Sequence, residues 1–189
     1  MVGGAGSDSF YVHDAGDTVV EAVGEGNDRV FASVDYALSA GAEVETLSTS
    51  SDAGTAAIDL TGNEFGQKLV GNNGDNTLDG GAGADSLLGN GGDDILIGGS
   101  GNDQMRGGGG TDEFLFNAGL FGNDTILDFA DGSEAIRFDG IAGVDDFSDL
   151  TVTANGAGWA VITLPDGSRI TLTGVGTGQV DATDFLFGP

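Results

Sequence analysis

Large apolar residues recur at every ninth position through the middle of this chain. From Gly62 to Leu115 they occupy the eighth place of six consecutive nine-residue units, at Leu69, Leu78, Leu87, Leu96, Met105 and Phe114. The residue before each is usually polar and the one after it varies. This brief alternation predicts one very short β-strand per unit, with a single side chain in the core. No helix of ordinary length is predicted anywhere in the chain.

The first half of each unit has the composition of a turn. Glycine fills the first position of all six units and the fourth position of five. Because glycine tolerates positive φ, it permits tight turns whose backbone carbonyls are left free. The sixth position carries an acid or an amide throughout, in the order Gln67, Asn76, Asp85, Asp94, Asp103 and Asp112.

Acidic side chains stacked at this period predict a bound cation. Neighbouring strands of a sheet lie about 4.8 Å apart, and carboxylates at that spacing repel one another by roughly a few kcal/mol. Calcium takes six to eight oxygen ligands at roughly 2.3 to 2.6 Å, so an ion between two rungs can accept both carboxylates and the turn carbonyls. Metals that prefer sulfur or imidazole are excluded, because the chain has no cysteine and only one histidine, His13.

These units resemble the GGxGxDxUx repeats of the RTX (repeats-in-toxin) family, the calcium-binding right-handed parallel β-roll of bacterial type I secreted proteins. Residues 80–88 (GGAGADSLL) and 98–106 (GGSGNDQMR) match every specified position. The resemblance implies that one coil takes two units and that calcium pairs each unit with the next but one. The paired residues are then Asp85 with Asp103, Asp94 with Asp112, and Asn76 with Asp94. Gln67 departs from the pattern, so the first site of the array is expected to be weak or absent.

Turn carbonyls are expected to complete the shell of each calcium ion. For the Asp85 and Asp103 pair these are the carbonyls of Gly80, Ala82, Gly99 and Gly101. For the Asp94 and Asp112 pair they are those of Gly89, Gly91, Gly108 and Gly110. Magnesium requires a smaller octahedral shell and releases water reluctantly, so the sites are expected to reject it.

The register divides the chain into four parts. Residues 1–31 form a first repeat block, in which Asp8 and Asp28 are one coil plus two residues apart and are expected to share an ion. Residues 32–61 lose the Gly-Asp register but keep alternation at 34–38, 44–47 and 57–60, which predicts bridging strands, with a loop over 48–55. Residues 62–115 are the second repeat block. Only two residues precede the first repeat, so we expect a fragment of a longer parent protein.

Residues 116–189 are predicted to form a C-terminal β cap, because the last rung of a roll exposes core and unpaired backbone. Gly119 to Leu127 form a degenerate seventh unit that places Asp124 on the Asp103 side. A hairpin is predicted from strands at 159–164 and 169–172 around the turn Pro165-Asp166-Gly167. The runs DTILDFADGSEAIRF and DFLF resemble the C-terminal region of serralysin-type and related RTX proteins, which implies an uncleaved secretion signal. The alternative for DFLF is a final core strand without a signal function.

Composition restricts the partners. Thirty-one acidic residues oppose five basic ones, for a net charge of −26, which disfavours nucleic acid and anionic membranes. A halophilic surface would scatter its acids, and a disordered Gly/Asp tract would not place an apolar residue in every unit, so neither alternative explains the register. The sequence offers no secretory signal peptide, no apolar run of membrane-spanning length and no catalytic motif.

The leading hypothesis is therefore a non-enzymatic, monomeric module that binds several calcium ions and folds after export through a type I machinery to the exterior or the cell surface. The first alternative is an accessory module of a secreted enzyme that acts on polysaccharide, protein or lipid, with some polysaccharide binding of its own. The second is a rigid spacer in an adhesin or surface-layer protein. The sequence upstream of Met1 would distinguish these alternatives.

Overall fold

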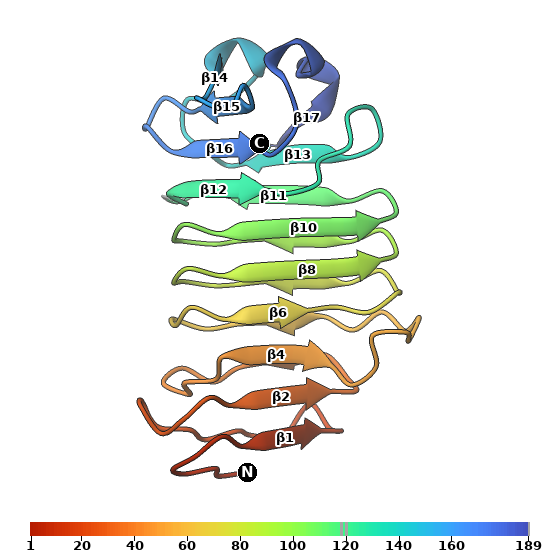
Figure 1. Cartoon of the computed structure of the whole chain (residues 1–189), viewed down its shortest axis with the longest axis vertical. Helices are drawn as coiled ribbons and strands as arrows, with labels where there is room; N and C mark the ends of the chain where they lie inside the picture. Colours follow the sequence, from red (N-terminus) through yellow and green to blue (C-terminus); the bar gives the residue numbers. More distant parts are fainter. Residues whose placement is uncertain (118, 120, 189) are drawn as a thin grey trace.

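Two sheets of short parallel strands, one on each side of an elongated roll, make up the computed structural model, which describes residues 1–117, 119 and 121–188 (Figure 1). Within these residues the first sheet follows the order β1 (Ser9–Val12), β2 (Arg29–Ala32), β4 (Thr46–Thr49), β6 (Lys68–Val70), β8 (Ser86–Gly91), β10 (Gln104–Gly109), β12 (Asn123–Ile126), β16 (Arg169–Leu172), β15 (Ala160–Thr163) and β14 (Thr151–Ala154). The second follows the order β17 (Phe185–Gly188), β13 (Ala135–Asp139), β11 (Glu113–Asn117), β9 (Ile95–Ile97), β7 (Thr77–Asp79), β5 (Leu60–Thr61) and β3 (Tyr36–Ala37).

Each coil of the central roll consumes two nine-residue units. Leu69 of β6 pairs with Leu87 of β8, which pairs with Met105 of β10, while Leu78 of β7 pairs with Leu96 of β9 on the opposite side. Units alternate between the sheets, as the resemblance implied. The predicted all-β parallel roll is confirmed.

A column of apolar side chains fills the space between the sheets. Every eighth-position residue from Leu69 to Phe114 is buried, with at most 1% of its surface exposed. Burying one such side chain stabilises the fold by about 1.5 to 3 kcal/mol. The column continues past Phe114 through Ile126 and Ile136, which are also fully buried.

Strands between the two repeat blocks continue the same sheets. Strand β4 joins β2 to β6, and β5 joins β3 to β7. The predicted loop over 48–55 is wrong at its start, because Ser48 and Thr49 belong to β4 and are buried. Ser48 pairs with Phe31 and Val70, so ladder hydrogen bonds on both sides override the turn preference of serine.

The C-terminal segment covers the last rung of the roll. The hairpin is confirmed: β15 and β16 are antiparallel, and β16 pairs in parallel with β12. Strand β17, which contains the last three residues of the DFLF segment, pairs with β13, which in turn pairs with β11. Phe138 stacks on Phe185 with ring centroids 6.0 Å apart, so the cap has its own aromatic core.

Three 3₁₀ turns supply the only helix in the described part of the chain, η1 (Phe147–Asp149), η2 (Thr177–Gln179) and η3 (Ala182–Asp184). No helix of the described residues has the length and apolar character needed to cross a membrane.

Candidate metal centre

Sixth-position carboxylates form two ladders, each at the entrance to one sheet. On the first side the backbone N–H of Asp85 donates to Asp103 Oδ1 at 2.8 Å. On the second side the N–H of Asp94 donates to Asp112 Oδ1 at 2.9 Å. Each bond joins residues 18 apart, which is one full coil. The structure thus brings together both acidic pairs that the register predicted.

The degenerate seventh unit extends the first ladder. The N–H of Asp103 donates to Asp124 Oδ1 at 2.8 Å, across 21 residues. This coil is three residues longer than a regular one, yet Asp124 keeps the same position relative to Asp103 as Asp103 has relative to Asp85. The predicted position of Asp124 on the Asp103 side is confirmed.

The second oxygen of each of these carboxylates is buried and has no partner. Among the described residues this holds for Oδ2 of Asp85, Asp94, Asp103, Asp112 and Asp124. All five residues are at most 3% exposed. Leaving a charged oxygen buried and unpaired is costly, so these oxygens need a ligand of opposite charge. Buried carboxylate oxygens without a partner suit calcium, the hard cation that the sequence predicted.

Two kinds of glycine shape the turn around each carboxylate. At the first position the requirement is space: a Cβ on Gly80 would lie 2.7 Å from Asp85 Oδ2, and one on Gly89 would overlap Asp94 Oδ2. At the second and fourth positions the requirement is conformation, as Gly81 at φ 89° and Gly83 at φ 115° illustrate. The predicted need for positive φ therefore holds for the turn but not for its first glycine.

Several predicted carbonyl ligands are free of hydrogen bonds. Backbone hydrogen bonds connect successive turns. The N–H of Ser100 donates to the Gly81 carbonyl and the N–H of Gly83 donates to the Ser100 carbonyl, both at 2.9 Å. Within the described residues no hydrogen bond is donated to the carbonyl oxygens of Gly80, Ala82 or Gly99 outside the strand ladders. Their role as ligands, and that of Gly101, Gly89, Gly91, Gly108 and Gly110, stays a prediction.

Burial raises the pKa of the ladder carboxylates when no cation balances them. Burial raises the pKa of Asp85 to about 7, and the neighbouring Asp103 charge adds to the rise against the lowering effect of the Gln67 N–H. Burial likewise raises the pKa of Asp94 to about 7 and that of Asp124 to about 8. A bound cation would remove both causes, because it replaces lost hydration and offsets the repulsion.

Amides replace the acids at the N-terminal end of the array. Gln67 donates from Nε2 to Asn63 Oδ1 at 2.6 Å and accepts the Asn63 N–H at Oε1. Asn76 donates from Nδ2 to the Ile58 carbonyl and accepts the Asn72 N–H at Oδ1. Both amides are thus engaged within the protein, although the N–H of Asn76 still donates to Asp94 Oδ1. A calcium ion shared by Asn76 and Asp94 stays a prediction.

The first repeat block continues the first ladder. The N–H of Asp8 donates to Asp28 Oδ1 at 2.7 Å across 20 residues, so the predicted pair does meet. The N–H of Asp28 donates in turn to Glu45 Oε2 at 2.5 Å. Sequence reasoning missed Glu45, because its turn keeps only one glycine, Gly41. The available signal was Leu47, the buried residue two places later.

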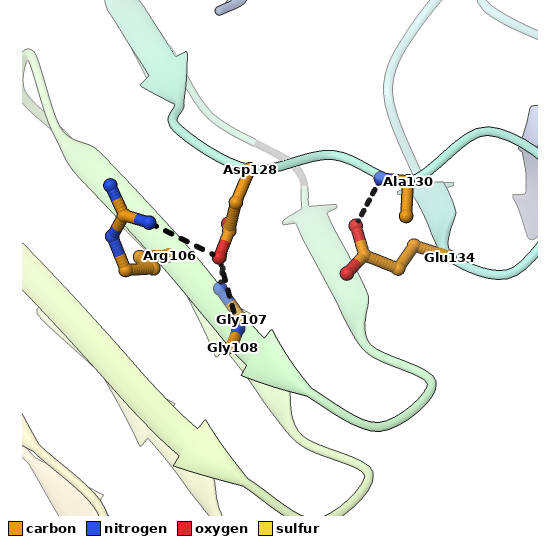
Figure 2. Close-up of polar contacts among 6 residues, drawn as sticks. All are labelled: Arg106, Gly107, Gly108, Asp128, Ala130 and Glu134. Carbon is orange, nitrogen blue, oxygen red and sulfur yellow. Dashed lines mark hydrogen bonds and ion pairs between the residues drawn. The ribbon is translucent and has the colours of Figure 1, made fainter.

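The far end of the second ladder is closed by two further acids that the sequence did not assign (Figure 2). Asp128 accepts the N–H groups of Gly107 and Gly108, each at 3.1 Å, and lies 3.6 Å from Arg106 Nη1. Glu134 accepts the Ala130 N–H at 2.8 Å. Burial raises the pKa of Glu134 to about 7, with the charges of Asp112 and Asp128 adding to the rise. Both acids follow Asp112 without glycine-rich turns, so the repeat pattern gave no signal for them.

Fold and site together define a class: a parallel β-solenoid whose turns present buried, unpaired carboxylates to hard cations. Residues 61–96 and 88–126 match the family profile described as the RTX calcium-binding nonapeptide repeat. The chain therefore carries RTX calcium-binding nonapeptide repeats, as the resemblance indicated. No curated protein sequence matches the chain significantly.

Solved structures share the roll. The AlgE6R3 subunit of the Azotobacter vinelandii mannuronan C5-epimerase is 28% identical, over 65% of this chain and 78% of that one, with a TM-score of 0.52. The AlgE6R2 subunit of that epimerase is 24% identical, over 71% and 94%, with a TM-score of 0.53. The extracellular lipase LipA of Serratia marcescens is 19% identical, over 96% of this chain and 37% of the lipase, with a TM-score of 0.52. The last two likenesses concern the fold alone.

Proposed function

We propose that this chain is a calcium-dependent folding module of a secreted protein, with no catalytic activity of its own. The observation that carries the proposal is the row of buried, unpaired Oδ2 atoms along the two ladders. Without a cation the folded state must confine these carboxylates near one another. With calcium bound, the same oxygens become ligands, so the free energy of metal binding becomes free energy of folding.

In this proposal each residue type has a separate task. The carboxylates supply charge, and their Oδ1 atoms are oriented by the N–H of the preceding coil. The first glycines leave room for Oδ2, and the turn carbonyls supply neutral oxygens. Calcium, when bound, supplies the positive charge that lets neighbouring rungs stack. The proposed pairs are Asp85 with Asp103, Asp94 with Asp112, Asp103 with Asp124, Asp8 with Asp28, and the weaker Asn76 with Asp94.

The same chemistry supports an extracellular location. A cytoplasm low in calcium would leave the ladders repelling one another and the chain unfolded, which suits passage through a type I exporter. Calcium outside the cell would then fold it as a monomer. The RTX calcium-binding repeats of residues 61–126 support this order of events.

A calcium titration followed by circular dichroism tests the proposal. We expect little β signal in excess chelator, recovery of the signal as calcium is added, and no recovery at millimolar magnesium. A β signal that is unchanged by chelator would refute calcium-dependent folding.

A second candidate function is an accessory module for a polysaccharide-modifying enzyme. The 28% identity with an epimerase subunit over most of that subunit favours it. Isothermal titration of the calcium-loaded chain with mannuronan oligomers tests binding. Heat release with mannuronan but not with neutral dextran oligomers of equal length would support this function, and no heat with either would argue against it.

A further inference from the structure

A third carboxylate joins the pair formed by Asp8 and Asp28 at the N-terminal end of the roll. One oxygen each from Asp8, Glu21 and Asp28 lies within 4.8 Å of the other two. Glu21 is 2% exposed and Asp28 is 1% exposed. The family profile begins at residue 61, so it does not reach these residues.

The two carboxylate oxygens of Glu21 have different surroundings: one accepts a hydrogen bond, and the other has no partner. Its Oε1 accepts the N–H of Gly4 at 3.2 Å. Its Oε2 is buried and has no hydrogen-bond partner among the described residues. Among the described residues, no basic side chain lies within ion-pair distance of Asp8, Glu21 or Asp28.

Glu21 Oε2 occupies the place that a backbone carbonyl takes in the repeat coils. A Cβ on Gly80 would meet Asp85 Oδ2 at 2.7 Å and the carbonyl oxygen of Gly98, one coil on, at 2.6 Å. The equivalent position on Gly3 faces Asp8 Oδ2 at 3.0 Å and, closer still, Glu21 Oε2. A charged side-chain oxygen thus stands where the other coils present a neutral one.

The sequence explains how Glu21 reaches this place. Glu21 and Ala22 are the two residues inserted between the second and third units, and the unit after them begins with Val23 rather than glycine. The insertion lengthens the coil, since Asp8 and Asp28 are 20 residues apart instead of 18. The insertion therefore supplies the carboxylate oxygen that stands near Gly3 where the regular coil has a backbone carbonyl.

We propose that Asp8, Glu21 and Asp28 form a calcium site of a different kind from the ladder sites, with three carboxylates and Glu21 as a direct ligand. Because calcium affinity rises with the number of charged ligands, this site should bind calcium more tightly than the Asn76 and Asp94 site, which offers one carboxylate. Only the identity of the ion rests on the proposed function. The site itself rests on the convergence of the three acids.

Graded substitution of Glu21 in the full chain tests the site. Glu21→Gln keeps an uncharged oxygen like the carbonyls of other coils, and Glu21→Ala removes the oxygen. Equilibrium dialysis at low micromolar free calcium should show one fewer ion bound by Glu21→Ala, and an affinity for that ion at least about tenfold lower in Glu21→Gln. Asp52→Asn, which removes one exposed charge in a loop, is the matched control and should bind as many ions as the unaltered chain.

Two outcomes separate this inference from the proposed function. If calcium folds the chain but Glu21→Ala retains every ion, the inference on Glu21 is wrong, while the proposed calcium sites of the ladders are unaffected. If calcium does not fold the chain, the proposed function fails, and a crystal of the full chain grown with calcium decides the site alone. Density bonded to all three carboxylates supports it, whereas a gap there would mean that Glu21 is neutral and buried for structural reasons.

Because Glu21→Gln preserves the shape of the side chain, its circular dichroism in saturating calcium shows whether lost binding reflects misfolding.

Discussion

At the scale of single residues, each repeat uses two residues for two roles. An aspartate supplies a carboxylate held in a fixed orientation, and a glycine leaves the space that this carboxylate occupies. Asp94 illustrates the first role, since one oxygen is held by the Asn76 N–H and the other is free. Gly89 illustrates the second, because any side chain there would displace the free oxygen. Both roles are local, and each can be removed by one substitution.

Asp94→Ala should remove more calcium than Asp75→Ala. Asp94 lies on the ladder between Asn76 and Asp112, so its loss affects up to two ions. Asp75, at position 5 of the unit that also holds Asn76, is exposed and accepts the N–H of Asp93. Isothermal titration with calcium measures both variants. Equal loss in the two would contradict the assigned register.

Gly89→Ala should weaken calcium binding although it removes no ligand side chain. Its methyl group would overlap Asp94 Oδ2 and would also crowd the Gly107 carbonyl. Overpacking of this kind costs about 1 to 3 kcal/mol. Gly156→Ala is the control, because nothing lies within 4 Å of a Cβ there and its φ is not positive. Urea unfolding in saturating calcium would show a loss for Gly89→Ala alone.

At the scale of elements, prediction from the sequence succeeded where the period was regular. Leu69 and Leu87 are 18 residues apart, and that interval sets both the strand pairs and the carboxylate pairs of the central coils. It failed for Glu21, Glu45 and Asp128, which reach the rungs from coils of irregular length. The Asp8 to Asp28 rung spans 20 residues and the Asp28 to Glu45 rung 17. Such residues are found only when the backbone is traced, since no fixed spacing marks them.

Removing the chain after Asp128 should lower calcium affinity in the remaining coils. Strand β13 pairs with β11 along five residues, and Arg137 forms a double hydrogen bond with Glu113 at 2.6 and 2.8 Å. Loss of β13 would uncover Phe114 and Phe116 and so reduce the cooperativity that links folding to binding.

Calcium titration of the truncated chain measures this effect. Leu186→Ala in the full chain is the control, because that side chain is 39% exposed in the last strand. A soluble, folded truncated chain with unchanged affinity would mean that the cap does not stabilise the roll.

At the scale of the whole molecule, the metal-free chain should be more stable in acid than at neutral pH. The ordinary pKa of Asp is 3.8, whereas in the folded state it is about 7 for Asp85 and Asp94 and about 8 for Asp124. Between pH 3.8 and about pH 8, these carboxyl groups are more protonated in the folded state than in the unfolded chain. Stability is therefore present at low pH and is lost as pH rises toward 8.

Circular dichroism in chelator at pH 5 and pH 8 measures the difference, because a larger β signal at pH 5 would report the greater stability of the folded state. Asp124→Asn, which removes the most strongly shifted of these groups, should flatten the dependence. In saturating calcium the trend should reverse, since protons then compete with the ion. A metal-free chain that gains stability from pH 5 to pH 8 would show that the ladders are not protonated when folded.

The hydrogen bonds of the first ladder also give the stack a direction. The carboxylates of Asp28, Asp103 and Asp124 each accept a hydrogen bond from the backbone N–H of the aspartate one coil earlier in the chain. An open N-terminal end therefore presents carboxylates that water solvates readily, while an open C-terminal end presents N–H groups that await an acceptor. Coils should add most easily from the C-terminal end toward the N-terminal end and be lost in the opposite order. Hydrogen exchange should accordingly be faster at the amide of Asp8 than at that of Asp103.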